Sequence, residues 1–198
     1  MESFEIHITT LPENYNELKQ YCDKTNIKYI KCLNSSGVHP IQCMTTYKFS
    51  NINSEYAITI ALEKCEQLIN NGFTVIRTKV EKLLSMNSKY ALEKDQYFES
   101  HFKIYLCDEN KKNSLMTLIS SLEGIYNSTN STKYCDESIY PREILLTIRK
   151  YEIDIDYFFK LIEDFKLKLI ENNYQIISIQ REASVYDDNI DLDNGWIF

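Results

Sequence analysis

The stretch that decides the fold is Phe4-Glu5-Ile6-His7-Ile8-Thr9, because the chain repeats it in altered form as Phe98-Glu99-Ser100-His101-Phe102-Lys103. The chain has three histidines, and two of them occupy equivalent places in these segments. Polar and apolar residues alternate in both segments, which is typical of half-buried strands. The alternation predicts one polar face on each strand, and these faces carry Glu5, His7 and Thr9 in the first copy and Glu99, His101 and Lys103 in the second.

The repeat extends well beyond the first strand. From Pro40 onward, equivalent residues lie 101 positions apart, as in Pro40 and Pro141, Thr46 and Thr147, Lys48 and Arg149, and Tyr56 and Tyr157. The first strands lie only 94 positions apart, so seven extra residues are expected in the second copy, near its Ser/Thr/Asn stretch at 127–132. Agreement without gaps from Pro40 to the end of the first copy predicts an internal duplication.

Each copy reads as strand, helix, strand, strand, helix, strand. Strands are expected at 4–10, 27–33, 41–49, 73–83, 97–106, near 127–132, at 142–151 and from 174 onward, and helices at 13–24, 54–71, 111–123 and 154–172. This order predicts an α+β fold made by tandem duplication of a ferredoxin-like βαββαβ unit, with two antiparallel sheets, helices outside and a pseudo-two-fold axis. We expect the repeats to span 1–84 and 96–198 in one compact body, onto which the C-terminal residues 196–198 dock.

The composition is typical of a globular protein, with 43% hydrophobic and 26% charged residues. A net charge of −7 argues against bulk binding of nucleic acid or anionic membranes, which requires a basic surface. No apolar run approaches the length of a membrane span and the N-terminus does not resemble a signal peptide, so a cytoplasmic location is expected. The six cysteines form no CxxC pair, which predicts reduced thiols rather than a zinc site.

Polar residues of several predicted strands are expected to face a shared interior. Besides the two histidine strands, the third and fourth strands of each copy contribute Thr46, Lys48, Arg77, Lys79, Thr147 and Arg149. Five cations would then converge on one surface, at Lys48, Arg77, Lys79, Lys103 and Arg149. Buried charges need partners or water. This face is therefore expected to pair its charges with the glutamates, to be hydrated, or to receive a small anionic or nucleotide-like ligand.

Near the C-terminus, Asn189, Asp191 and Asp193 alternate as ligands of a calcium loop do. Gly195 lies one place too late for the required turn, however, and no bidentate glutamate follows. Calcium is therefore not expected here. The sequence predicts neither a metal nor a cofactor.

Two motifs carry resemblances to known families. His7-Ile8-Thr9 resembles the H-x-T signature of the 2H phosphoesterases, in which one such motif from each of two lobes acts on a phosphodiester. The resemblance implies His7 and His101 as acid and base and Thr9 as a phosphate contact, whereas Lys103 stands where the second hydroxyl belongs. Glu99-x-His101-x-Lys103 is also similar to the E-x-E-x-K strand of triphosphate-tunnel enzymes, although the further paired glutamates of those enzymes are missing.

Nearly the full length also resembles a little-characterised family of bacterial and viral proteins. The resemblance lies in the first strand, in Glu99-x-His101-x-Lys103, and in an ending like Ser184-Val185-Tyr186-Asp187 followed by Leu192-Asp193 and Gly195-Trp196. It implies no particular activity.

The leading functional hypothesis from the sequence is a phosphate-binding pocket between the two repeats, with His7 and His101 hydrolysing a phosphodiester. A second hypothesis is a non-catalytic binding or scaffold protein, in which each Lys or Arg meets a Glu or Asp and no pocket exists. A triphosphate-tunnel-like phosphohydrolase is the third.

Overall fold

The computed structural model describes residues 2–122, 124–130 and 143–197. The strands are β1 (Ser3–Thr10), β2 (Lys28–Asn34), β3 (Ile41–Ser50), β4 (Val75–Leu83), β5 (Tyr97–Tyr105), β6 (Ile125–Asn130), β7 (Glu143–Tyr151) and β8 (Gln175–Asp187). The α-helices are α1 (Tyr15–Thr25), α2 (Ser54–Asn70), α3 (Glu109–Ser120) and α4 (Ile155–Glu171). Two short 3-10 helices, η1 (Pro12–Asn14) and η3 (Ile190–Asp193), complete the described elements. The expected elements are present, with ends that differ by a few residues.

The two long helices begin in the same way. The Asn53 side chain accepts a hydrogen bond of 2.8 Å from the backbone N–H of Tyr56 at the start of α2. At the start of α4, Asp154 accepts one of 2.7 Å from the backbone N–H of Tyr157. Such caps satisfy a backbone donor that a helix leaves without a partner at its first turn.

The strands form one antiparallel sheet that closes into a barrel, in the order β1-β3-β2-β6-β7-β5-β8-β4. Within this circle the first half of the chain runs β4-β1-β3-β2 and the second half runs β8-β5-β7-β6. The fold is therefore mixed α+β with an eight-stranded antiparallel sheet among the described residues. The two antiparallel sheets expected from the sequence are instead one continuous sheet around a shared interior. Their edge strands pair directly, β4 with β8 and β2 with β6, which gives partners to backbone groups that open edges would leave exposed.

Strand register is the same in both halves. In the first half Glu5 lies opposite Lys48 and His7 opposite Thr46, on neighbouring strands β1 and β3. The second half repeats this between β5 and β7, where Glu99 lies opposite Arg149 and His101 opposite Thr147. Equivalent polar side chains therefore meet equivalent neighbours inside the barrel.

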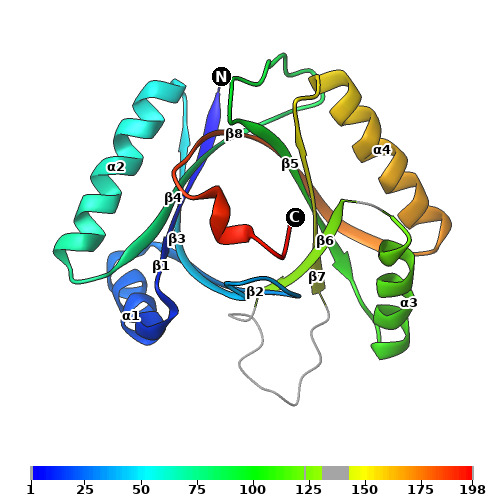
Figure 1. Cartoon of the computed structure of the whole chain (residues 1–198), viewed down its shortest axis with the longest axis horizontal. Coiled ribbons are helices and arrows are strands. Elements are labelled where there is room, and N and C mark those ends of the chain that lie inside the picture. Colours follow the sequence, from blue (N-terminus) through cyan, green and yellow to red (C-terminus); the bar gives the residue numbers. More distant parts are fainter. Residues whose placement is uncertain (1, 123, 131–142, 198) are drawn as a thin grey trace.

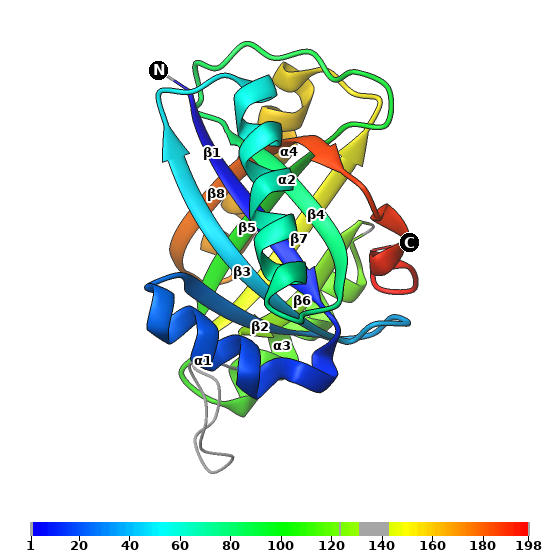
Figure 2. The same ribbon diagram turned by 90° about the vertical axis from the view of Figure 1, so that its left-hand side faces the viewer.

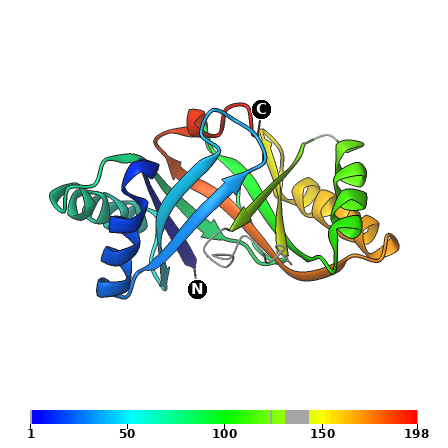
Figure 3. The ribbon, with the colours of Figure 1, turned by 90° about the horizontal axis from the view of Figure 1, so that it is seen from below.

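Apolar side chains of the same strands point outward, where helices cover them. Helices α1 and α2 lie against one side of the barrel, and α3 and α4 against the opposite side (Figures 1 and 3). One buried cluster contains Phe4, Ile6 and Ile8 of β1, and the other contains Phe98 and Phe102 of β5. Because the hydrophobic cores lie outside the barrel wall, alternation places most of the polar residues of these strands in the interior.

The C-terminal segment crosses one mouth of the barrel (Figures 1 and 2). Trp196 donates its indole N–H to the carbonyl of Asn127 at 3.0 Å, and Asp193 of η3 is 1% exposed. Gly195 has a φ of +74°, and a Cβ there would lie 3.3 Å from the Cα of Gly37. Glycine suits both the backbone angle and this approach. The predicted docking of Phe198 lies outside the described residues.

None of the helices in the described part of the chain is long and apolar enough to cross a membrane. Cys22, Cys32, Cys43, Cys65 and Cys107 are free thiols, while Cys135 lies outside the described residues.

Candidate functional site

A cavity of about 270 Å³ lies inside the barrel, lined by side chains from all eight strands and from the C-terminal segment. Most of the residues predicted from sequence line it: Glu5, His7, Thr9, Arg77, Lys79, Glu99, His101, Lys103, Thr147 and Arg149. The other two contact residues of the lining, Thr46 with His7 and Lys48 with Glu5. The structure thus brings the predicted residues together.

His7 lies between a threonine and two carboxylates. Its Nδ1 is 3.0 Å from the Thr46 hydroxyl, and its Nε2 is 3.1 Å from Oε2 of Glu81 and 3.7 Å from Oε2 of Glu5. Glu5 also pairs with Lys48 on β3. Both glutamates are buried, at 3% exposed for Glu5 and 1% for Glu81, so water does not screen these contacts.

His101 has the same surroundings in the second half. Its Nδ1 is 3.0 Å from the Thr147 hydroxyl, and its Nε2 is 3.4 Å from Oε2 of Glu182 and 3.6 Å from Oε2 of Glu99. Arg149 donates to Oε1 of Glu99 through Nε at 3.0 Å and Nη2 at 2.9 Å. The arginine therefore takes the place that Lys48 has in the first half.

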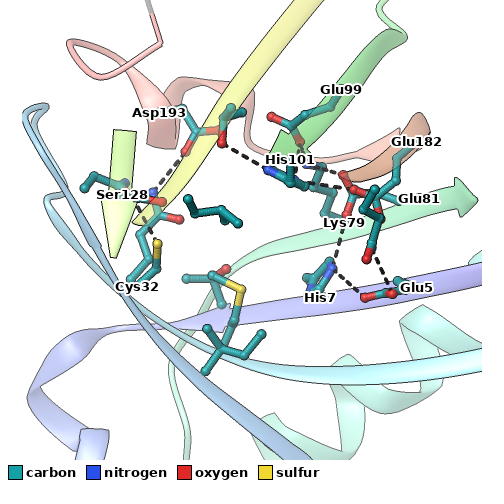
Figure 4. A pocket seen from close by; sticks show the side chains of 18 of the residues that line it. Glu5, His7, Cys32, Lys79, Glu81, Glu99, His101, Ser128, Glu182 and Asp193 are labelled. Carbon is teal, nitrogen blue, oxygen red and sulfur yellow. Dashed lines mark hydrogen bonds and ion pairs between the residues drawn. The ribbon is translucent and has the colours of Figure 1, made fainter. Parts of the chain in front are cut away.

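Two bridging residues join the halves. Lys79 contacts Glu81 of its own strand and Glu99 of the other half, each at 2.5 Å. Gln180 joins the halves in the equivalent way, since it donates to Glu182 of its own strand at 2.6 Å and to Glu5 of the first half at 3.0 Å. The result is a closed ring, part of which is visible in Figure 4. We call it the carboxylate–histidine ring, and its members in order are Glu5, His7, Glu81, Lys79, Glu99, His101, Glu182 and Gln180.

The environment of the ring shifts several pKa values. Burial opposes the charged form of Glu99, but Arg149 and Lys79 outweigh it and lower the pKa of Glu99 to about 2. Burial and the nearby Glu81 raise the pKa of Glu182. The pKa of His101 is raised to about 9, because its contacts with Glu182 and Glu99 outweigh the effect of burial. His101 is therefore an imidazolium at neutral pH.

A second set of ion pairs anchors the C-terminal segment at one end of the ring. Asp193 accepts from Arg77 at 3.0 Å, from Arg149 at 2.8 Å and from Gln42 at 2.9 Å. Arg77 also binds Asp187, with an Nε–Oδ1 distance of 2.9 Å. Burial raises the pKa of both aspartates, but the arginines outweigh it and lower them below the usual range. These charges hold η3 against the barrel.

The opposite wall of the cavity, formed by β2, β3, β6 and β7, is more apolar. Ile30, Met44 and Leu145 line it, together with Trp196 from the C-terminal segment. Asn34 also lines this wall and is 8% exposed, and its Nδ2 has no hydrogen-bond partner among the described residues. A buried amide donor without a partner costs free energy, which an acceptor on a bound molecule would recover.

The interior is not a pocket of unpaired cations, because the predicted cations meet carboxylates. Its connected ion pairs contain six carboxylates, of Glu5, Glu81, Glu99, Glu182, Asp187 and Asp193, and four cations, of Lys48, Arg77, Lys79 and Arg149. Lys103, the fifth predicted cation, lies 3.9 Å from Glu143. The prediction of a cationic pocket is therefore wrong. The sequence pattern revealed the cations together with Glu5 and Glu99, but not the other carboxylates of these ion pairs, Glu81, Glu182, Asp187 and Asp193.

Two of the four carboxylates that the sequence analysis did not predict, Glu81 and Glu182, could have been found from strand alternation. Glu81 follows Arg77 and Lys79 on alternate positions of one strand, and Glu182 follows Gln180 in the same way. Strand alternation therefore places them on the inner face. Asp187 lies beyond a β-bulge and Asp193 lies in the C-terminal segment, so alternation does not reach them.

No family model and no curated protein matches the chain. Among solved structures, the chain is similar to a "putative monooxygenase" from Lactobacillus acidophilus NCFM, with 16% identity, a TM-score of 0.29, and coverage of 93% of each chain. It is also similar to a "putative monooxygenase" from Fusobacterium nucleatum subsp. nucleatum, with 11% identity, a TM-score of 0.35, and coverage of 100% of this chain and 97% of the other. At these values the likeness carries no conclusion on activity.

The geometry of the site corrects the predicted phosphate binding and 2H-like phosphodiester hydrolysis. Each histidine turns Nε2 toward two carboxylates, which would repel a phosphate, and the surrounding cations are already paired. The triphosphate-tunnel hypothesis is wrong for the same reason. The scaffold hypothesis expected ion pairs without a pocket, whereas the interior contains both.

Proposed function

We propose that the barrel interior binds a small, uncharged organic molecule. The observation that carries this proposal is the cavity of about 270 Å³ between the carboxylate–histidine ring and an apolar wall. The ligand's apolar body would lie against Ile30, Met44 and Leu145, and its polar group would face the ring. An enclosed, largely apolar pocket with a few convergent polar groups is the usual form of a small-molecule site.

The charge of the cavity's ion pairs favours an uncharged ligand over an anionic one. With neutral histidines the connected ion pairs have two more carboxylates than cations, and the proton on His101 reduces this excess without reversing it. An anionic ligand would therefore lose its hydration without gaining a free counter-charge. A primary amide suits the site better, because its N–H groups can donate to the ring and its carbonyl can accept from Asn34 Nδ2.

The size of the cavity limits the affinity. A ligand of about ten heavy atoms that is fully enclosed by apolar and hydrogen-bonding contacts is expected to bind with about 4–7 kcal/mol. This corresponds to a dissociation constant between about 1 mM and 10 µM. Such affinities are measurable by calorimetry and by the fluorescence of Trp196, which lines the cavity and is the single tryptophan of the chain.

The test compares two molecules of the same shape, benzamide and benzoate. We expect benzamide to bind at least about tenfold more tightly, a difference of about 1.4 kcal/mol or more. Leu145→Trp should abolish binding by filling the cavity, whereas Leu167→Trp, at a position 54% exposed on α4, should leave it unchanged. Equal or tighter binding of benzoate, or benzamide binding that Leu145→Trp does not affect, would contradict the proposal.

We also infer that the barrel arose by tandem duplication of a ferredoxin-like βαββαβ unit. Support comes from the strand orders β4-β1-β3-β2 and β8-β5-β7-β6, and from the matching registers of His7 with Thr46 and His101 with Thr147. On this view His7 and His101 are equivalent groups at one site, and the bridges Lys79 and Gln180 are positions where the copies have diverged.

A further inference from the structure

We infer that Glu81, His101 and Glu182 form a binding site for a divalent transition-metal ion. These residues come from β4, β5 and β8, and their donor atoms all lie within 4.8 Å of one another. The inference goes beyond the proposed function and is independent of any organic ligand. It also departs from the sequence, which predicted no metal.

The spacing of the donor atoms suits a metal ion. Histidine nitrogen and carboxylate oxygen bind Zn²⁺ at about 2.0–2.2 Å, so two ligands of one ion lie roughly 3–4 Å apart. Nε2 of His101 and Oε2 of Glu182 are 3.4 Å apart. Small rotations of these side chains therefore bring the donors to bonding distance without moving the strands.

One carboxylate oxygen of the cluster has only a long contact. Glu182 is 0% exposed, and its Oε2 faces Nε2 of His101 at 3.4 Å without a closer hydrogen bond from a described residue. Oε1 of Glu81, by contrast, is held by Lys79 at 2.5 Å. A buried carboxylate oxygen is stabilised by a close cation, which a metal ion on Nε2 of His101 would supply to Glu182.

Neighbouring residues already hold the ligands in position. The Thr147 hydroxyl contacts Nδ1 of His101 at 3.0 Å, which leaves Nε2 facing the two carboxylates. His7 Nε2 lies 3.1 Å from the Oε2 atom of Glu81, and Gln180 donates to Oε1 of Glu182. Metal-binding histidines and carboxylates commonly have such supporting hydrogen bonds, which fix their orientation.

The charge of the interior agrees with a divalent ion. A metal ion on Nε2 of His101 replaces the proton that this histidine carries at neutral pH. With that proton gone, the six connected carboxylates exceed the four cations by two. One divalent ion balances this excess, although Lys79 competes with it for Glu81. A mixed nitrogen and oxygen ligand set favours Zn²⁺, Co²⁺ or Mn²⁺ over Ca²⁺ and Mg²⁺, which prefer oxygen ligands only.

The test is calorimetric titration of metal-free protein with Zn²⁺, with no organic ligand present. We expect one site per chain, about 100-fold weaker in His101→Asn and in Glu182→Gln. His39→Asn, which removes a histidine exposed in the loop before β3, should leave the affinity unchanged. His7→Asn, at the equivalent place in the other half, should weaken binding less than His101→Asn does.

Absorption of the Co²⁺-loaded wild-type protein keeps the inference testable if a variant fails to fold. Intense d–d bands of four- or five-coordinate Co²⁺ are expected, and the weak spectrum of hydrated Co²⁺ would overturn the inference. So would Zn²⁺ binding that His39→Asn removes or that Glu182→Gln leaves intact. The metal titration contains no benzamide, and benzamide binding is measured with a chelator present to remove metal ions. Failure of the metal-site inference is therefore distinguishable from failure of the proposed function.

Discussion

Lys48 and Arg149 occupy equivalent positions in the two halves, yet their surroundings differ strongly. Lys48 pairs with Glu5 and its side chain is 58% exposed, whereas Arg149 pairs with Glu99 and its side chain is 2% exposed. The cause is the C-terminal segment, whose Asp193 reaches Arg149 at 2.8 Å and covers that end of the barrel. The described residues contain no counterpart of this contact beside Lys48.

The comparison shows how a barrel with matching halves acquires a closed end and an accessible end. Arg77, Arg149 and Asp193 are all buried at the covered end. Lys103 and Glu143 line the cavity as well, but their side chains are 34% and 28% exposed. We therefore expect ligands to enter past Lys103 and Glu143, and the ion pairs at the covered end to contribute mainly to stability.

The largest expected effect is the difference in the free energy of unfolding between variants that lack Arg149 and variants that lack Lys48. Arg149→Met leaves buried carboxylates of Glu99 and Asp193 with fewer partners, so we expect a loss of about 3–5 kcal/mol in the free energy of unfolding. Lys48→Met should cost less than Arg149→Met does, because the Lys48 side chain is 58% exposed and Glu5 keeps a hydrogen bond from Gln180. Urea denaturation of both variants measures the difference, and equal losses would contradict a distinction between the two ends.

A smaller effect is expected from acid. The folded-state pKa values of Asp187 and Asp193 are lowered, so their stabilisation is fully present above the ordinary pKa of 3.8 and is lost as pH falls toward the folded values. Each such carboxylate contributes a slope of up to about 1.4 kcal/mol per pH unit in that window. Asp193→Asn should therefore reduce the loss of stability between pH 5 and pH 3.

Asp191→Asn provides the matched control, since Asp191 is an exposed residue of the same 3-10 helix. Its acid dependence should follow that of the wild type. If Asp193→Asn also followed the wild type, the buried ion pairs would not account for the acid sensitivity.

The smallest effect is expected from exchanging the two bridges. Lys79 and Gln180 each join a glutamate of their own strand to one of the other half. The double variant Lys79→Gln/Gln180→Lys keeps one cation in the ring and should unfold within about 1 kcal/mol of the wild type. Lys79→Gln alone should cost more, because the ring then lacks its lysine. A double variant less stable than the single one would show that the halves are not equivalent.

Much of the polar interior follows from strand alternation in the sequence. The inward placement of Glu5, His7 and Thr9 required only the period of two in the first strand, and the repeat extended it to His101. The element order was also predictable, because residues 101 positions apart repeat the same helix and strand pattern in both copies. These features depend on local residues and so can be read from a single chain.

The sign of the interior charge could not be predicted in the same way. Asp193 lies far along the chain from Arg77, and only folding of the C-terminal segment brings them to 3.0 Å. The closure of the barrel likewise depends on which edge strands meet, namely β4 with β8 and β2 with β6. Such long-range contacts have no local signature in the sequence. Because of them, cations that the sequence predicted as phosphate ligands are paired with carboxylates.

A crystal structure of the protein with benzamide tests the central claim most directly, namely that the barrel interior is a site for an uncharged molecule. We predict the phenyl ring against Leu145 and Met44, with the amide nitrogen within about 3 Å of a glutamate oxygen of the ring. Benzamide found only on the outer helices, or a phosphate ion seated against Lys79 and Arg149, would contradict it.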